Sequence, residues 1–187
     1  MKPMKRICAL LFAVMMMTVC TVIPANAAYS KTEYSGTTVD SSTRWPMRYK
    51  YVTTVYSDKT TYTKKEKVGI LQNTSSKAGK KSLSYQSKTE RSYSLGADIP
   101  LSILKSNVKA HLGGEVKYTQ SVTVSISNTI PANSTQNVYL QFQVRTVKYK
   151  HVKQKQVRAP GSNTFQNSGN AKTSYSTVTT RVPKLIL

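Results

Sequence analysis

The sequence predicts an all-β protein: a single antiparallel sheet of about six to seven strands, either elongated and twisted or folded into a sandwich. The first observation is a run of alternation from Val108 to Ser127, in which nearly every even position is apolar and every odd position is polar, charged or glycine. Period two places the apolar side chains on one face of a long β-strand. The second observation is that further alternating segments follow along the chain, separated by stretches rich in Gly, Asn, Pro and Ser that favour turns.

The first 27 residues have the pattern of a secretory signal peptide. A basic head precedes an apolar stretch without charge at residues 7–23, and Pro24-Ala25-Asn26-Ala27 is a cleavage site of the A-x-A kind. We expect residues 1–27 to be cleaved and residues 28–187 to form one secreted, extracellular β domain. The alternative is an uncleaved anchor, since the apolar stretch approaches the ~20 residues that span a bilayer.

The predicted mature chain is cysteine-free and strongly basic. Both cysteines and three of the 28 Lys and Arg lie in the signal peptide, so 25 basic and seven acidic residues remain and the net charge is +18. Such a field attracts polyanions. We expect the partner to be an anionic lipid or a cell-wall polymer, with nucleic acid as a non-specific alternative. The remaining alternative is a basic surface that has no dedicated partner.

The N-terminal third is expected to contain an edge element and one strand. Residues 28–44 show no sustained periodicity, which indicates a loosely held arm or a short edge strand. From Met47 the pattern places Tyr49 and Tyr51 on one face of a strand, with Arg48 and Lys50 on the other.

The middle of the chain predicts a long amphipathic hairpin. Alternation on the odd positions of 91–103 is followed by the turn 104–107 and then by the even-phase strand that begins at Val108. The strands 91–103 and 108–118 are each long enough to cross a membrane, which takes about 9–11 residues. The alternatives are a soluble sandwich with the same alternation, and a short amphipathic helix at 99–112 with Asp98 as cap, Pro100 in its first turn and Gly113 at its end.

Two more strands complete the predicted sheet. The apolar positions of 138–151 change from even to odd near Thr146, which indicates a β-bulge. A last strand is expected at 173–182.

The sequence does not predict an enzyme. The seven carboxylates and two histidines of residues 28–187 form no catalytic or metal-ligand motif, so we expect no catalytic residue, no metal and no cofactor. His111 and His151 lie on alternating segments, where a histidine at the surface is the default expectation.

Basic residues interleaved with aromatic residues form the first candidate site. Cations with Tyr or Trp suit anionic lipid headgroups, and they also suit nucleic acid, where aromatic rings stack on bases. The alternative is an ordinary polar face of the sheet. The residues that we predict to bind an anionic surface are Arg44, Trp45, Arg48, Lys50, Arg145, Lys148, Lys150, Lys153, Lys155 and Arg158.

The apolar side of the hairpin 91–127 forms the second candidate site. Its predicted membrane-facing residues are Leu95, Ile99, Leu101, Ile103, Val108, Leu112, Val116, Val122 and Val124.

The stretch 82–150 resembles the aerolysin-like β-pore-forming proteins. The matching features are a Ser/Thr-rich alternating hairpin at 92–127, the segment S-V-T-V-S-I-S-N-T-I-P-A, and the strand V-Y-L-Q-F-Q-V. The pattern S-L-G-A…L-G-G-E-V…S-V-T-V-S is also similar to small exported proteins of Gram-positive bacteria. The resemblance implies an elongated twisted sheet, homo-oligomers at a membrane, and a hairpin that inserts.

Together these observations predict a secreted, cationic, non-enzymatic protein that acts at anionic cell surfaces as a toxin-like or antibacterial β-pore former. The alternative is a binding or structural protein of the cell wall or extracellular matrix that holds anionic polymers without inserting into a membrane.

Overall fold

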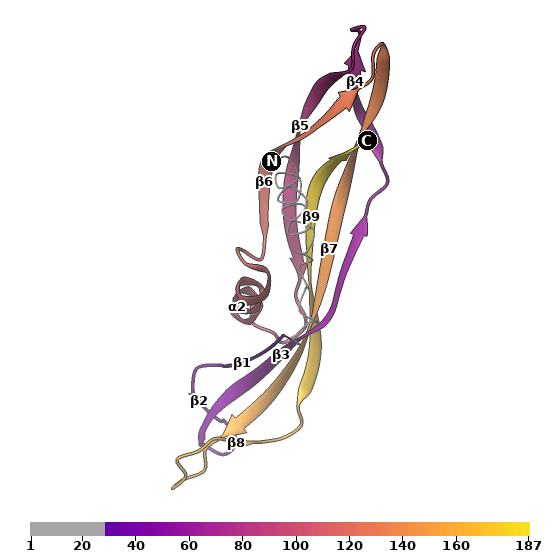
Figure 1. The fold of residues 1–187 in the computed structure, drawn as a ribbon. Helices are drawn as coiled ribbons and strands as arrows, with labels where there is room; N and C mark the ends of the chain where they lie inside the picture. The colour runs from indigo at the N-terminus through magenta and orange to yellow at the C-terminus, as the bar shows by residue number, and fades with distance from the viewer. Residues whose placement is uncertain (1–28) are drawn as a thin grey trace, which may run out of the picture.

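The computed structural model describes residues 29–187. The expected signal peptide at 1–27 lies outside the described residues. The described chain forms one elongated antiparallel sheet with a single helix at its side (Figure 1). The elements are β1 (Ser30–Tyr34), β2 (Thr38–Val39), β3 (Pro46–Tyr62), β4 (Glu66–Asn73), β5 (Gly79–Ser94), α2 (Leu101–Leu112), β6 (Tyr118–Ile130), β7 (Ser134–Val157), β8 (Gln166–Asn167) and β9 (Lys172–Ile186).

The sheet confirms the predicted all-β class, with more strands than expected. Its order is β1-β3-β7-β9-β5-β6, while β2 pairs with β3, and β4 and β8 pair with β7. The sequence predicts six to seven strands and the described residues contain nine. The excess is β2 and β8, which have two residues each and are too short to leave a periodic pattern.

The central strand β7 buries opposite faces in its two halves. The strand β7 runs from the top to the bottom of Figure 1, so we call the half of the sheet around its first part the upper half and the half around its last part the lower half. Val138 and Leu140, at even positions, are buried in the upper half, whereas Val147, Tyr149 and His151, at odd positions, are buried in the lower half. The bulge predicted near Thr146 is wrong, because the pairing of β7 with β9 is regular from 139 to 153. The phase changes because different elements cover the two halves, each on its own side of the sheet.

The upper half is covered by β5 and β6. From Gly79↔Ile130 to Arg91↔Tyr118 these two strands pair with each other, and we call them the β5–β6 ribbon. Apolar side chains of the ribbon pack on Leu71 of β4, Val138 and Leu140 of β7, and Leu185 of β9. These contacts bury the even side of β7, as expected for two β layers packed face to face.

The lower half is covered by α2. Leu104 and Val108 of the helix are fully buried against Val147 and Tyr149 of β7 and Val178 of β9. Ile103 of the helix packs with Ile99 and with Tyr51 of β3.

The predicted hairpin with strands 91–103 and 108–118 and a turn at 104–107 is wrong, and its helical alternative is confirmed. Pro100 is the N-cap of α2, and Gly113 ends the helix with φ +71°, a conformation that glycine adopts without strain. Asp98 does not cap, since α2 has no side-chain cap hydrogen bond. Ile103, Leu104, Asn107 and Val108 form a buried stripe with helical spacing, and the alternation of the same stretch is incidental.

Candidate functional site

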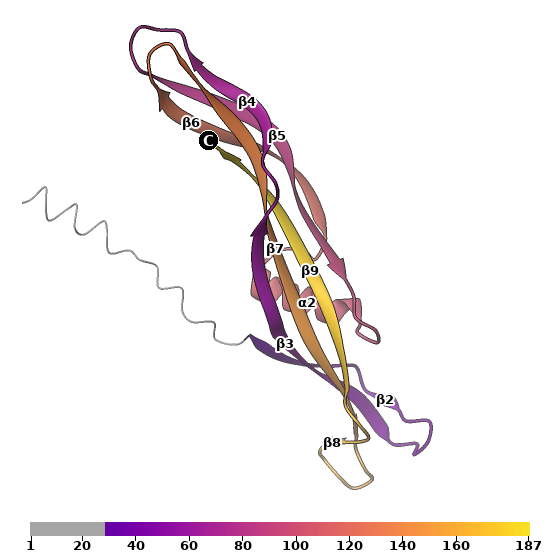
Figure 2. The ribbon, with the colours of Figure 1, turned by 90° about the vertical axis from the view of Figure 1, so that its right-hand side faces the viewer.

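One face of the lower half of the sheet is not covered by α2. Antiparallel partners point to the same side of a sheet, so Arg48 and Lys50 of β3 share a face with Gln156 and Gln154 of β7, opposite to Tyr49 and Tyr51. The even residues Lys148 and Lys150 continue this face along β7. We call it the open face. Figure 2 shows α2 behind β7 and β9, with the side away from the helix toward the viewer.

Two groups of cations and aromatic rings lie on the open face. In the first, the guanidinium carbon of Arg48 lies 4.1 Å from the ring centroid of Tyr34 and 4.2 Å from that of Phe165. Arg158 contacts the same Phe165 ring at 5.5 Å. These distances are within the ~6 Å of a cation–π contact, so the rings hold the cations in place without neutralising their charge.

The second group surrounds Lys148. Its Nζ lies 5.2 Å from the Tyr56 ring centroid and 4.6 Å from that of Tyr175, and the two rings are in edge-to-face contact at 5.2 Å. Tyr56 is 59% exposed and Tyr175 is 41% exposed. Tyr56 lies at an even position of β3, as Arg48 and Lys50 do, and next to the register shift between Val55 and Ser57. The group therefore combines a cation with two accessible amphipathic rings.

The carboxylates of the lower half lie away from the open face. Glu33 pairs with Lys31, Asp58 with Arg145 and Asp40 with Lys155. Within residues 29–187 these are the ion pairs, so Arg48, Lys50, Lys148, Lys150 and Arg158 keep their full charge. Hydrogen bonds from Lys155 and Ser42 hold the pKa of Asp40 well below its ordinary value, and the guanidinium of Arg145 lowers the pKa of Asp58.

The structure separates the residues predicted to bind an anionic surface into two sets. Arg48, Lys50, Lys148, Lys150 and Arg158 lie together on the open face. Of the others, Arg145 and Lys155 are neutralised by Asp58 and Asp40, and Lys153 lies on the helix side with its Nζ 4.3 Å from the Tyr49 ring. Arg44 and Trp45 lie in the turn that precedes β3.

Four aromatic residues of the open face were not predicted from the sequence: Tyr34, Tyr56, Phe165 and Tyr175. Tyr34 and Phe165 belong to segments without periodicity, so no sequence signal marked them. Tyr175 occupies an odd position of β9 and pairs with Lys150, which places it on the open face. The pairing of β7 with β9 cannot be deduced from the sequence, so the face of Tyr175 could not be predicted.

The β5–β6 ribbon is the second candidate site. Its outer side is polar: Ser84 and Ser125 are exposed and hydrogen-bonded to each other at 2.7 Å. On its inner side Tyr85, Val124 and Ile126 pack against the core of the upper half. Of the ribbon, only Glu90 and Arg91 also pair with β9, so residues 79–89 bond to β6 alone. The ribbon therefore meets the body of the protein through side chains rather than through a backbone ladder.

The predicted membrane-facing residues do not share one surface. Val122 and Val124 lie on the inner side of the ribbon and are half-buried. Ile99, Ile103, Val108 and Val116 belong to the core under α2, Leu101 and Leu112 are packed against that core, and Leu95 is 40% exposed. The ribbon is thus displaced from the predicted hairpin 91–127, with strands at 79–91 and 118–130 joined by the segment that contains α2.

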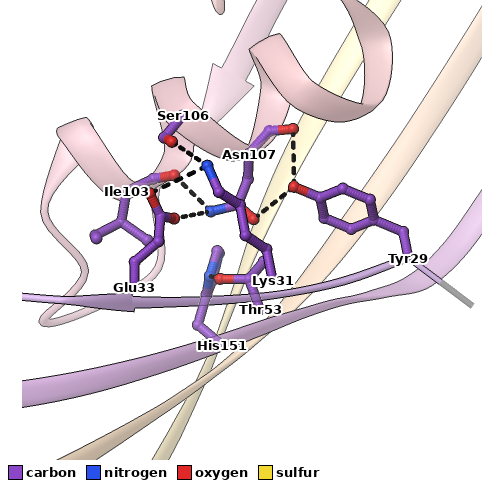
Figure 3. Close-up of polar contacts among 8 residues, drawn as sticks. All are labelled: Tyr29, Lys31, Glu33, Thr53, Ile103, Ser106, Asn107 and His151. Atoms are coloured by element: carbon purple, nitrogen blue, oxygen red, sulfur yellow. Dashed lines mark hydrogen bonds and ion pairs between the residues drawn. The ribbon is translucent and has the colours of Figure 1, made fainter.

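A polar cluster connects α2 to the N-terminal strand β1 (Figure 3). Asn107 of the helix is fully buried and donates hydrogen bonds to Oε2 of Glu33 at 2.8 Å and to the carbonyl oxygen of Ile103 at 2.7 Å. The Tyr29 hydroxyl donates to Oδ1 of Asn107 at 2.9 Å. Lys31 bonds to the hydroxyl of Ser106 and pairs with Glu33 at 3.3 Å. We call Tyr29, Lys31, Glu33, Ser106 and Asn107 the β1–α2 polar cluster.

The two histidines are less exposed than the sequence predicts. His151 is fully buried next to this cluster, with Nδ1 2.9 Å from Oγ1 of Thr53, and its Nε2 has no hydrogen-bond partner among residues 29–187. Its surface location is therefore a wrong prediction. His111 is half-buried, 3.1 Å from the Tyr149 hydroxyl. Burial lowers the pKa of both histidines, because a charged imidazolium loses its hydration there.

The described residues provide no grouping of three His, Cys, Asp or Glu side chains around which a metal ion could be held. Among residues 29–187, no helix has both the length and the apolar character needed to cross a bilayer.

Comparison with known proteins gives structural similarity only. No protein-family model and no curated protein sequence matches the chain. It is similar to the crystal structure of parasporin-2, a Bacillus thuringiensis toxin that recognises cancer cells (14% identity, 74% of each chain, TM-score 0.30). It is also similar to a proposed pore-forming toxin of Bacteroides vulgatus (11% identity, 83% of this chain and 82% of that one, TM-score 0.28). A third match is the binary complex of Cry23Aa1 and Cry37Aa1 (9% identity, 91% and 83%, TM-score 0.29).

The solved structures that the chain is similar to thus include a parasporin and a proposed pore-forming toxin. TM-scores of this size do not assign the chain to a family.

Proposed function

We propose that this is a secreted, cationic, non-enzymatic protein that binds anionic cell surfaces through the open face and then inserts the β5–β6 ribbon, as a toxin-like or antibacterial β-pore former. The observation that carries the proposal is the open face itself. Among residues 29–187 it combines five cations that form no ion pair with three exposed or half-exposed tyrosines, and the carboxylates of the lower half lie elsewhere.

The chemistry of this face suits an anionic membrane. Tyrosine prefers the headgroup region, where its ring meets apolar chains and its hydroxyl meets water. Each Lys or Arg near an anionic surface contributes about 1 kcal/mol of attraction. Cations held between rings are already ordered, so less side-chain entropy is lost on binding.

The ribbon supplies a segment able to leave the body. Its outer side is rich in Ser and Thr, and its inner side is apolar at Val122, Val124 and Ile126 of β6 and at Leu83 and Tyr85 of β5. Lys81, Ser87 and Thr89 make the rest of the inner side of β5 polar. The alternation of β6 is the pattern of a membrane-crossing β-strand. Because residues 79–89 bond to β6 alone, the ribbon can separate from the sheet without losing a backbone ladder along most of its length. Several copies on one membrane would be needed to enclose a pore, so homo-oligomers on the membrane are part of the proposal.

The alternative proposal is a wall or matrix protein that holds anionic polymers without insertion. It is favoured by the packing of α2, since Leu104 and Val108 are fully buried and lengthening the ribbon past Tyr118 would expose them. Exposing each such side chain costs roughly 1.5–3 kcal/mol.

Release of a trapped dye from vesicles of phosphatidylglycerol and phosphatidylcholine tests the choice between the two proposals. The decisive pair of variants is Val122→Asp and Thr123→Asp, which add the same charge to the inner and outer sides of the ribbon. Val122 is half-buried and belongs to none of the three core clusters, so Val122→Asp is expected to fold, as circular dichroism would verify.

Pore formation requires release by the wild type and by Thr123→Asp, with at least tenfold less release by Val122→Asp. Vesicle binding without any release, equal for all three proteins, would instead support the polymer-binding alternative. Absence of both binding and release would overturn the pore former.

A further inference from the structure

A cavity of about 460 Å³ lies between α2 and the segment that leads from the helix into β6. Its apolar wall consists of Val116, which is 5% exposed, together with Tyr93 and Leu101, which pack against the core cluster under the helix. The volume is within the roughly 300–1,000 Å³ of sites that bind small molecules. An apolar group can therefore be placed against a wall that the fold already provides.

The mouth of the cavity is basic. Lys105 and Lys109 project from successive turns of α2, and Lys117, the residue before β6, lines the same cavity. None of the three belongs to an ion pair among residues 29–187, and α2 contains no acidic residue. Glu115 also lines the cavity, so the lining carries a net charge of +2. Three ammonium groups that form no ion pair and outnumber the one carboxylate of the lining favour a bound anion.

The segment that closes the cavity is held in place by Arg91. Nη1 of Arg91 donates to the carbonyl oxygen of Gly113 at 2.7 Å and to that of Glu115 at 2.9 Å, and its Nε donates to the hydroxyl of Thr180 at 3.0 Å. Arg91 is 9% exposed and its guanidinium carbon lies 5.1 Å from the Tyr118 ring. The cavity is thus a built feature of the fold, which reduces the entropy that binding would cost.

From this geometry we propose that the cavity binds one anionic amphiphile, with a phosphate held by Lys105, Lys109 and Lys117 and an apolar chain lying on Tyr93, Leu101 and Val116. Compact ammonium groups bind phosphate as point charges. The site differs from the open face, since it lies beside α2 and has an apolar wall. The proposal does not depend on pore formation, because one protein molecule in solution would bind one amphiphile without a membrane.

The test is titration calorimetry below the micelle concentration with four probes: dihexanoylphosphatidylglycerol, hexyl phosphate, inorganic phosphate and dihexanoylphosphatidylcholine. We expect hexyl phosphate to bind at least tenfold more tightly than inorganic phosphate, because only the former reaches the apolar wall. If dihexanoylphosphatidylglycerol binds as tightly as hexyl phosphate, the cavity accepts the phosphate and chains of a membrane lipid. Much weaker binding identifies a single-chain phosphate as the ligand.

The overturning results are equally specific. Inorganic phosphate that binds as tightly as hexyl phosphate would reduce the site to a basic surface, and phosphatidylcholine that binds as tightly as phosphatidylglycerol would reduce it to an apolar groove. Binding of none of the four also ends the proposal.

Variants locate the binding. The double variant Lys105→Gln with Lys109→Gln should bind hexyl phosphate at least tenfold more weakly than the wild type. The double variant Lys64→Gln with Lys65→Gln has the same net charge but changes an exposed loop, and its affinity for hexyl phosphate should change less than twofold. An equal loss in both variants would show that net charge alone is responsible and would overturn the site. Lys117→Gln gives an independent check, and movement of the Gly114 amide resonance on titration should accompany binding.

Discussion

Asn107 of α2 and Glu33 of β1, 74 residues apart in the sequence, are joined by a hydrogen bond of 2.8 Å in the interior of the lower half. The same amide accepts from Tyr29 and donates to the Ile103 carbonyl, so its oxygen and both of its hydrogens are satisfied. The bond connects the first strand of the described chain to the helix that carries the core of this half. β1 is an edge strand, and this bond gives it a role in fixing α2.

Asn107→Ala should therefore destabilise the protein by about 1–3 kcal/mol, because it removes a buried group from three hydrogen bonds. Urea unfolding followed by circular dichroism measures the change. Lys109→Ala, on the exposed side of the same helix, is the matched control and should change stability by less than about 0.5 kcal/mol. An unchanged unfolding midpoint for Asn107→Ala would mean that the β1–α2 polar cluster does not hold the helix.

A second prediction concerns pH and His151. Burial lowers the pKa of His151 and of His111 below the ordinary value of 6.5, so below pH 6.5 the unfolded chain binds protons that the folded chain does not. Stability should be full above pH 6.5 and fall as the pH decreases from there, by at most about 1.4 kcal/mol per pH unit for each histidine.

The measurement is the urea midpoint at pH 7.5 and at pH 5.5. Asp40 and Asp58 have pKa values lowered from 3.8, so their contribution is retained in this range and is lost only in stronger acid. His151→Gln should reduce the difference between the two midpoints, and His111→Gln should reduce it separately. A midpoint that is equal at both pH values in the wild type would contradict the effect of burial.

The all-β class could be predicted from the sequence, and so could the side chains that share one face of a single strand. Tyr49 and Tyr51 do lie on the face opposite to Arg48 and Lys50, because period two within one strand is a property of the strand itself. Periodicity within one segment did not distinguish the helix α2 from the predicted hairpin with strands 91–103 and 108–118. Val108 and Leu112 satisfy both periods, and the outcome depends on the burial of Leu104 and Asn107 by strands far away in the sequence.

Prediction of the candidate sites from the sequence was limited for the same reason. Parity along β7 separates Lys148 and Lys150 from Arg145, Lys153 and Lys155, but it does not reveal which side is covered. That depends on α2 lying on the odd side of the lower half and the ribbon on the even side of the upper half. Asp40 and Lys155 form an ion pair although they are far apart in the sequence. The sequence therefore does not show which cations are neutralised by a carboxylate and which are not.

A third prediction tests the contact between the loop before α2 and β9. A Cβ added to Gly96 would lie 2.5 Å from the carbonyl oxygen of Tyr175, a backbone atom that cannot rotate away. Gly96→Ala should therefore displace the loop and destabilise the protein by about 1–3 kcal/mol, as overpacking does. Gly36→Ala is the control, since a Cβ there meets nothing within 4 Å. Thermal unfolding of the two variants measures the difference, and equal melting temperatures would contradict this account of Gly96.

A fourth prediction measures the open face. Lys148→Gln with Lys150→Gln removes two cations that lie outside ion pairs, and at about 1 kcal/mol each the partition onto anionic vesicles should fall roughly 30-fold at low salt. Lys64→Gln with Lys65→Gln has the same net charge but changes an exposed loop of the upper half, so its partition should fall clearly less. Centrifugation with vesicles at several salt concentrations gives both values, and the difference between the variants should shrink as salt screens the charges. If the two double variants lose affinity equally at every salt concentration, attraction by overall charge explains the binding and the open face has no special part in it.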